Sequence, residues 1–260
     1  MLPLFLVRGV LTGEMTVVPA ILESSDRFGD VAAEVADDGG LCGEKFFVDY
    51  ATAASHHLVA ARCRDALGLY LVDSGQPQVE MTPAPTLGRT PAARVRYENA
   101  RAEALCGADG HAFLIQLARA LCAAQGLACM QVALEMSVAY TSIREQFGRP
   151  IGSFQAVQHH AADMAIDTES ARFLVYEALD ALDHGDASEE QVALAKAAVS
   201  RTAPEVTMLA QQLHGGQGFI EENDLYFFTL RGKERSLAWG TREECLAVVA
   251  ETVEREQDWL

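Results

Sequence analysis

Two segments of the chain combine residue types that can hold a negatively charged group. The first is Arg144-Glu-Gln-Phe-Gly-Arg-Pro-Ile-Gly-Ser-Phe-Gln155, and Gln212-Leu-His-Gly-Gly-Gln-Gly-Phe219 follows about sixty residues later. The guanidinium of Arg144 can fork onto an anionic oxygen, glycines let backbone approach closely, and the amide of Gln212 can bridge polar edges. Taken singly, the first segment is also typical of a solvated helix end and Gly215-Gly216 of a C-cap turn. The interpretation therefore depends on the two segments together.

Other candidate chemistry is weaker. His159 and Asp163 lie four residues apart and could be two metal ligands, but no third ligand is evident. We therefore interpret them as a pair on a helix surface and predict no metal site. His56 and His57 lie on a predicted strand with alternating faces, so both cannot point to one site. The sequence carries no Ser-His-Asp or phosphate-loop signature.

Composition limits the classes of partner. The chain has 260 residues and a formal net charge of −17; half of its residues are hydrophobic and 22% are charged. Such an acidic, core-forming chain repels phosphate backbones and anionic lipid, so we expect it to bind neither nucleic acid nor a membrane surface. Local arginines and backbone amides can still hold a phosphate-bearing cofactor.

The cysteines and the first residues indicate the compartment. No CxxC pair occurs, and most of the cysteines have apolar neighbours, which predicts buried, reduced thiols. They are Cys42, Cys63, Cys106, Cys122, Cys129 and Cys245. The apolar residues 1–7 are too short for a membrane-spanning helix and lack a basic start. We therefore expect a cytoplasmic protein.

The chain divides into two halves with different hydrophobic periods. After a lead-in over residues 1–12, short apolar runs separated by Gly, Pro, Asp and Thr predict strands over 13–109. They include 45–48, 57–61, 68–73 and 93–97. This half is predicted to be a small antiparallel β-domain or barrel. From residue 110 to 260, apolar residues recur at helical spacing.

Helix breakers and N-cap residues divide the second half into four predicted helices. They cover about His111–Gln146, Ser153–Leu182, Ser188–Leu213 and a last helix after Thr241. Thr241 and Glu244 form a capping-box pattern at the start of the last helix. The sequence thus predicts an α+β fold in which the β-domain precedes an antiparallel four-helix bundle.

This order, together with the two segments quoted first, resembles the acyl-CoA dehydrogenase family over nearly the whole chain. Members of that family oxidise the Cα–Cβ bond of an acyl-CoA thioester with FAD. Their middle domain is a β-domain and their C-terminal domain a helical bundle. Resembling chains begin with a further all-helical domain, which we expect to be absent here because Thr12-Gly-Glu-Met-Thr16 looks like the lead-in to the middle domain.

The resemblance implies a shared FAD site. In such dimers the C-terminal domain of one subunit contacts the adenosine and pyrophosphate of the flavin seated in the other. The residues implied for these contacts are Arg144, Gln146, Phe147, Gln212, Gly215 and Gly216. Thr241 and Glu243 are implied as further cofactor-binding residues. Where the family commonly has Ala-Leu-Thr-Glu near the flavin ring, this chain has Ala20-Ile-Leu-Glu23. Where many members have Trp-Ile-Thr, it has Phe47-Val-Asp49, whose carboxylate would disfavour a reduced anionic ring.

The resemblance also implies that the catalytic carboxylate is missing. The reaction needs a base within reach of the thioester α carbon. The family places a glutamate at one of two positions, and these correspond here to Trp239 and Ala118, beside Arg119. From residue 110 to residue 134 there is no Asp or Glu, and Glu234 lies five residues before Trp239. Trp239 could fill the space of an acyl chain or be a core aromatic residue at a turn.

These expectations favour a non-catalytic subunit of a heteromeric acyl-CoA dehydrogenase. Its partner would be a catalytic subunit carrying the glutamate, in an α2β2 heterotetramer that shares FAD. Heteromeric members of the family act on bulky acyl-CoA substrates such as steroid side chains, which makes lipid metabolism and steroid degradation the implied context. Two alternatives stay open: a self-sufficient homodimer with a base from another region, and a purely structural paralogue.

Overall fold

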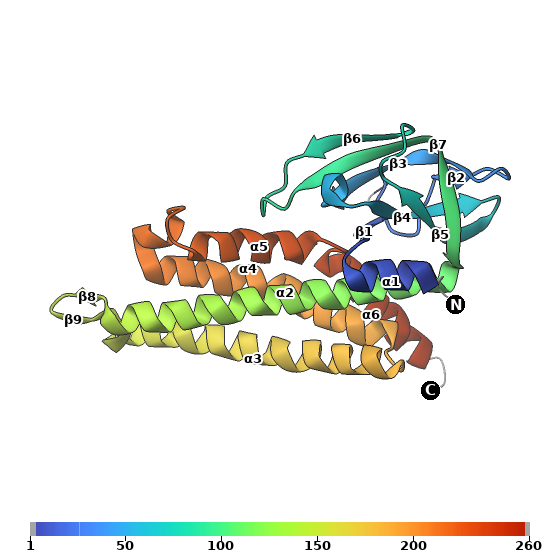
Figure 1. Cartoon of the computed structure of the whole chain (residues 1–260). Coiled ribbons are helices and arrows are strands. Elements are labelled where there is room, and N and C mark those ends of the chain that lie inside the picture. Colours follow the sequence, from blue (N-terminus) through green and yellow to red (C-terminus); the bar gives the residue numbers. More distant parts are fainter. Residues whose placement is uncertain (1–3, 26, 258–260) are drawn as a thin grey trace. The chain divides into compact units, whose positions relative to one another are not determined.

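The computed structural model describes residues 4–25 and 27–257. They fall into two compact units, Met1–Ile115 and Gln116–Leu260. In Figure 1 the blue to green part of the chain forms the strands β1 to β7, and the green to red part forms the long helices.

The N-terminal unit contains a seven-stranded sheet. Its strands are β1 (Val17–Ala20), β2 (Glu34–Val35), β3 (Gly40–Asp49), β4 (His56–Cys63), β5 (Ala66–Asp73), β6 (Val79–Ala84) and β7 (Ala92–Gly107), and the short 3-10 helix η1 is Ala51–Ala53. Pairing runs from β4 through β5, β7, β3 and β2 back to β4, so the strand path closes on itself. This agrees with the barrel form of the prediction.

The expected antiparallel pairing is only partly right. β1 and β2 both pair with β4 in parallel, whereas the other pairs of this sheet are antiparallel. Hydrophobic alternation reports which face of a strand is buried, and it carries no information on the direction of the neighbouring strand. The sheet is therefore mixed.

The sequence did not predict the first helix, α1 (Leu4–Thr12), which occupies most of the expected lead-in. It ends at Gly13, whose φ of 74° is typical of a residue just past a helix C-terminus. The amide of Gly13 donates to the carbonyl of Val10 at 3.1 Å. A run of nine mostly apolar residues is too short to show a clear hydrophobic period, which explains why the helix was missed.

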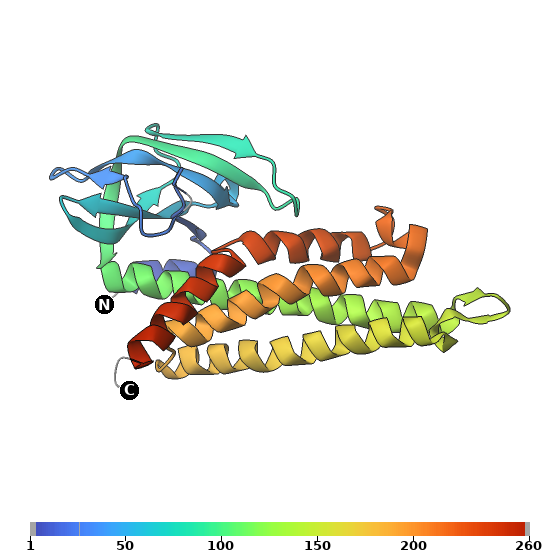
Figure 2. The same ribbon diagram turned by 180° about the vertical axis from the view of Figure 1, so that it is seen from behind.

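The second half of the chain is helical. Its elements are α2 (Ala108–Ile143), the two-stranded hairpin β8 (Glu145–Gln146) and β9 (Arg149–Pro150), η2 (Ile151–Ser153), α3 (Gln155–His184), α4 (Glu189–His214), η3 (Gly215–Phe219), α5 (Leu225–Leu237) and α6 (Arg242–Gln257). Figures 1 and 2 show α2, α3, α4 and α5 lying side by side. The described part of this half thus holds five long helices rather than the four expected, because α5 was not predicted.

Hydrogen bonds at the starts of α3, α4 and α6 show which residues cap these helices. Ser188 caps α4, and its side chain accepts from the amide of Gln191 in a complete capping box. At α6, the amide of Thr241 donates to Glu244 at 2.7 Å, and the Thr241 hydroxyl accepts from the Glu244 amide at 3.3 Å. The expected cap Ser153 is wrong, since Phe154 is the N-cap of α3 and makes no side-chain cap hydrogen bond. The Ser153 hydroxyl donates instead to the carbonyl of Pro150.

Small and branched apolar side chains from α2, α3, α4 and α5 form one core. Its fully enclosed members include Ala123, Met130, Met164, Val206 and Leu225. By length and composition α2 could also cross a membrane, and 44% of its most apolar window is buried. Core helices meet the same criteria, so the apolar character of α2 is accounted for by its place in this core.

Candidate functional site

The first motif lies on a tight hairpin, not on the end of a helix as expected. α2 ends at Ile143, three residues before the predicted end at Gln146. Phe147 and Gly148 form the two-residue loop between β8 and β9, with φ values of 55° and 77°. Two successive positive φ values are characteristic of a type I′ hairpin turn. The turn leaves Arg144 and Gln146 exposed and places Phe147, 93% exposed, at its tip.

Contacts within the hairpin fix its position on α2. The amide of Ile151 donates to the carbonyl of Arg144 at 2.8 Å. The guanidinium of Arg149 lies 4.1 Å from the ring centroid of Phe154, a cation–π contact. A Cβ at Gly152 would lie 3.0 Å from the carbonyl oxygen of Thr141, so the chain returns tightly against the end of α2. These contacts fix the hairpin and leave the Arg144 side chain exposed.

The second motif forms the end of α4 and the start of η3. Gly215 has φ 59° and ψ −138°, a conformation that favours glycine. A Cβ built on Gly215 or Gly216 would meet nothing within 4 Å, whereas one on Gly218 would lie 2.8 Å from the backbone of Gln211. Gly218 therefore serves packing. Gly215 and Gly216 expose bare backbone, beside the exposed Gln212.

A ring stack joins the two motifs. Tyr140 on α2 stacks on His214 at the end of α4, with 4.4 Å between ring centroids and 19° between planes. The imidazole of His214 is buried, and its Nδ1 lies 2.8 Å from the carbonyl oxygen of Ala210. The hairpin and η3 accordingly lie at the same end of the helical half in both Figure 1 and Figure 2. An exposed arginine and open glycine backbone at one end fit an anionic, phosphate-bearing group.

A hydrogen bond links the chain at one expected base position, Ala118, to the other, Trp239. Arg119, which follows Ala118 on α2, is 7% exposed, and its Nε donates to the carbonyl of Trp239 at 3.2 Å. Trp239 has φ 62° and Gly240 has φ 113°, so the turn between α5 and α6 is held in a conformation unusual for a tryptophan. Ala118 and Trp239 are both half-buried. Neither offers a group that accepts a proton.

Nearby carboxylates are engaged with other groups. Glu234 lies 3.1 Å from both Arg231 and Arg235. Glu244 caps α6, and Glu243 is exposed in its first turn, next to the capping Thr241. The expected cofactor roles of Thr241 and Glu243 stay predictions.

The sequence analysis did not predict the ion pair between Glu189 and Arg119, because the two residues lie seventy positions apart. The Glu189 Oε1 is 3.6 Å from a guanidinium nitrogen of Arg119. The only sequence signal was an acidic first turn after the Ser188 cap.

The sequence analysis also missed a buried lysine, which contacts the chain just before the turn at Trp239. Lys196 is fully buried, and its Nζ donates to the Ser200 hydroxyl at 2.8 Å and to the carbonyls of Arg235 and Ser236 at 3.0 and 3.1 Å. Burial lowers the pKa of Lys196 below its ordinary value. The lysine caps the carboxyl end of α5, where the helix dipole is negative, and so fixes the chain that leads to Trp239.

In the N-terminal unit, the segment that resembles the flavin-ring loop is tied to the sheet. Glu23 pairs with the buried Lys45 and accepts from the amides of Ala32 and Ala33 at 2.8 and 3.1 Å. Leu22 is half-buried, and its carbonyl accepts from the amide of Phe46. Asp49, also half-buried, ends β3. Leu22, the predicted counterpart of the family's threonine, supplies no polar side chain.

The predicted histidine–aspartate pair and the cysteines were the remaining candidates. Within residues 4–25 and 27–257, no group of three or more His, Cys, Asp or Glu side chains could hold a metal ion. His159 and Asp163 are exposed on α3. The expectation of buried thiols is right for Cys122, Cys129 and Cys245 and wrong for Cys42 and Cys106, which are exposed. Both lie on strands, where an apolar sequence neighbour points to the opposite face and gives no information on burial.

Comparison with known proteins identifies relatives. The family model described as the acyl-CoA dehydrogenase C-terminal domain matches residues 112–254, more than half of the chain. The 3-(aryl)acrylate reductase of Clostridium sporogenes is 28% identical over 83% of this chain and 62% of its own length. The cyclohex-1-ene-1-carbonyl-CoA dehydrogenase of Geobacter metallireducens is 36% identical over 55% of this chain and 39% of its own length. The chain therefore spans less than two thirds of these relatives.

Solved structures agree over more of the chain. A variant of the Tcur3481-Tcur3483 steroid ACAD superposes with a TM-score of 0.91 at 30% identity, covering 98% of this chain and 71% of that chain. The ChsE4-ChsE5 complex from Mycobacterium tuberculosis superposes with a TM-score of 0.86 at 26% identity, covering 95% of this chain and 68% of that chain. Both names denote pairs of proteins.

Proposed function

Because this chain belongs to the acyl-CoA dehydrogenase family, whose members are FAD-dependent oxidoreductases, we propose that it is the non-catalytic subunit of a heteromeric acyl-CoA dehydrogenase. In this proposal its helical half holds the nucleotide end of an FAD whose ring is seated in a full-length catalytic partner. FAD supplies the oxidising chemistry at its ring when bound. The chain works in the cytoplasm.

The observation that carries the proposal is that the helical half has residues suited to bind a nucleotide but no carboxylate at the predicted base positions. The two nucleotide motifs are joined by the Tyr140–His214 stack. The two positions at which the resemblance predicts a base hold Trp239 and Ala118, and Arg119, next to Ala118, donates to the Trp239 carbonyl. Arg144 would pair with pyrophosphate oxygens, and the amides near Gly215 and Gly216 would approach the same group. The proton at the substrate α carbon would be taken by the partner's carboxylate.

Two further observations support a partner. By the sequence resemblance, Leu22 corresponds to the family's ring-contacting threonine and offers no polar group there, so this chain is poorly suited to seat a flavin ring itself. The similar solved structures include two-protein complexes, one of them a steroid ACAD. We extend that to this chain as a proposal: an α2β2 assembly acting on a bulky, steroid-type acyl-CoA.

The decisive experiment is co-expression with full-length acyl-CoA dehydrogenases from the same genome, purified through a tag on this chain. The expected result is one copurified homologue in equal amount, with flavin absorbance and acyl-CoA oxidation. This chain alone should carry little flavin and show no turnover. Stoichiometric flavin on the isolated chain, with turnover, would overturn the proposal.

Glu189 favours a second candidate, a self-sufficient homodimer with a non-standard base. Its carboxylate pairs with Arg119, the residue that holds both base positions together. Turnover by the isolated chain that is lost in Glu189→Gln would support this enzyme. A purely structural paralogue is distinguished by a complex whose flavin content does not depend on Arg144.

A further inference from the structure

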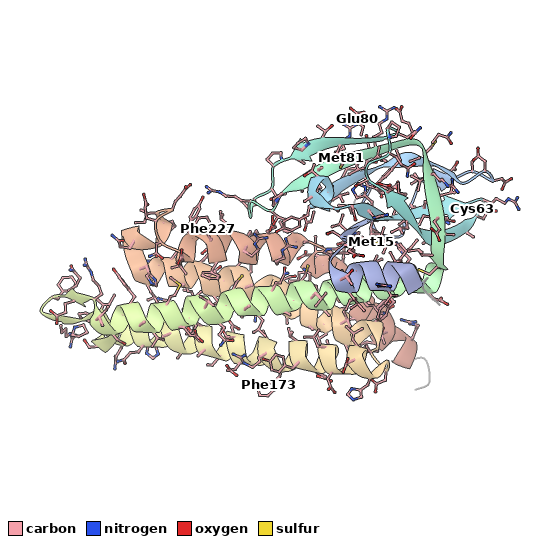
Figure 3. The ribbon with its side chains drawn as sticks, viewed as in Figure 1. Met15, Cys63, Glu80, Met81, Phe173 and Phe227 are labelled. Atoms are coloured by element: carbon pink, nitrogen blue, oxygen red, sulfur yellow. The ribbon has the colours of Figure 1, made fainter. Side chains whose placement is uncertain are left out.

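The chain passes from the sheet into α2 without a connecting loop. β7 ends at Gly107 and α2 begins at Ala108, and Figure 1 shows the strand leading directly into the helix. Gly107 pairs with Gly68 on β5, and Gly68 pairs in turn with Ala61 on β4. The first turn of α2 therefore starts beside the carboxyl end of β4, which Cys63 marks in Figure 3.

The first turn of α2 packs closely on the strands at this junction. A Cβ added to Gly110 would collide with the Sγ of Cys106, and one added to Gly68 would lie 2.9 Å from the carbonyl oxygen of Cys106. Residues 108–115 belong to the same compact unit as the sheet, whereas the rest of α2 belongs to the helical unit. The first two turns of α2 are thus the part of this helix that the sheet holds.

His111 lies in this segment and is buried with an unpaired nitrogen. It is 4% exposed, and its Nε2 has no hydrogen-bond partner among the described residues. The other buried histidine of this unit, His57, has a partner at both ring nitrogens. A neutral imidazole can leave one nitrogen unpaired at moderate cost, but an imidazolium would bury a charged N–H without an acceptor. The packing around His111 therefore suits only the neutral ring.

The charged groups that face His111 are mainly cations. Lys45 on β3 and Arg62 on β4 both act on the ring electrostatically. Glu23 pairs with Lys45, and Arg62 donates to two backbone carbonyls, which leave its charge in place. Asp109, on the same helix turn as His111, is exposed. Burial and then the two cations lower the pKa of His111 below its ordinary value, because each disfavours the protonated ring.

We propose that His111 controls the contact between the first two turns of α2 and the sheet: the neutral ring permits the contact, and the protonated ring breaks it. In the released turn the imidazole is solvated and has an ordinary pKa of about 6.5. The contact is therefore fully stable above this pH and is lost as the pH falls towards the lowered pKa of the packed state. The device needs neither cofactor nor partner, so it is independent of the proposed function.

Hydrogen–deuterium exchange of the full chain tests the release. The amides of residues 112–115 donate to carbonyls of the first turn of α2, so their protection is lost when a released helix end frays. After correction for the intrinsic pH dependence of exchange, we expect this protection to fall several-fold, and at most roughly tenfold, between pH 6.5 and pH 5.5. Residues 123–133, which lie in the helical core, should keep their protection over the same range.

Neutral substitutions separate His111 from other acid-sensitive groups. Neither His111→Gln nor His111→Phe can take up a proton, so protection of residues 112–115 should not depend on pH in either variant. His111→Phe also leaves no polar atom unpaired and should be at least as well protected as wild type at pH 7.5. His57→Gln is the matched control and should retain the local pH dependence. An unchanged pH dependence in the two His111 variants, or none in wild type, would overturn the proposal.

A second measurement needs no substitution. An NMR titration of the assigned His111 ring protons in the wild-type chain should give a midpoint below pH 6.5, and the protection of residues 112–115 should fall over the same pH range. A midpoint at or above pH 6.5 would show that the packed turn accommodates the charged ring. That result would overturn the proposal even if both neutral variants failed to fold.

Discussion

The phenol ring of Tyr140 lies 4.4 Å from the imidazole of His214 and is nearly parallel to it. One residue ends the α2 segment that leads to Arg144, and the other precedes Gly215 directly. The stack therefore joins two motifs that are far apart in the sequence. In the proposed function it determines whether Arg144 and the glycine backbone can contact one pyrophosphate.

Tyr140→Ala should weaken this coupling. Loss of the stack removes about 0.5 to 1.5 kcal/mol beyond area burial, so we expect a lower unfolding midpoint and reduced flavin retention by the complex. Tyr140→Phe keeps the ring and should retain both properties. The measurements are chemical unfolding and the flavin-to-protein ratio after gel filtration. If the alanine variant retains flavin as well as the phenylalanine variant does, the stack has no positioning role.

Arg144→Ala should reduce flavin retention while leaving assembly intact. A charge-assisted hydrogen bond contributes roughly 1.5 to 3 kcal/mol, and one exposed arginine contributes little to an interface. Arg149→Ala is the matched control, because it removes the same charge from the same hairpin but from a guanidinium held over Phe154. Equal flavin loss in both variants would attribute the effect to net charge, and unchanged flavin in Arg144→Ala would contradict the shared-cofactor proposal.

The caps and the motif chemistry were readable from the sequence because they are local. Thr241 forms the predicted capping box with Glu244, three positions later, and this prediction is confirmed. The start of the third predicted helix at Ser188 is likewise local, because Ser188 forms a capping box with Gln191. The hairpin at Phe147 was missed because a non-glycine residue at positive φ is uncommon. Its Gly148 was interpreted only as a helix breaker.

Long-range features were not readable. The pairing of Glu189 with Arg119 and the burial of Lys196 against the end of α5 join positions tens of residues apart. No periodicity in one sequence specifies such contacts. The contacts of Arg119 and Lys196 are also the ones that hold the turn at Trp239.

His57 should make folding sensitive to mild acid. It is buried, its Nε2 lies 3.2 Å from the Ala51 carbonyl oxygen and its Nδ1 lies 2.9 Å from the Tyr97 hydroxyl, so the neutral ring satisfies both contacts. Burial lowers the pKa of His57 below 6.5. The unfolded chain therefore takes up this proton before the folded chain does. Stability present above about pH 6.5 is lost as the pH falls towards the lowered folded pKa.

The check is a series of urea unfolding midpoints between pH 7.5 and pH 5, compared with His57→Gln. The glutamine variant keeps a polar side chain but does not titrate, so its midpoint should fall less steeply over this range even though it starts lower. Parallel slopes for the two proteins would assign the acid sensitivity to other groups. His111, which is also buried with a lowered pKa, is the next group to test.

Trp239→Glu restores a carboxylate at the family base position, and we expect it to create no activity in the isolated chain. A base is useful only beside a seated flavin ring and a bound thioester, and Leu22 and Asp49 are the predicted counterparts of the family's ring-contacting residues. The backbone of Trp239 is left-handed, and Arg119 donates a hydrogen bond to its carbonyl. The glutamate side chain would therefore start from the same fixed backbone turn. The measurement is dye-linked oxidation of a panel of acyl-CoA substrates by the isolated variant and by wild type. Measurable turnover by the variant alone would show that the chain seats flavin and substrate by itself, and the self-sufficient homodimer would then replace the non-catalytic subunit as the better account.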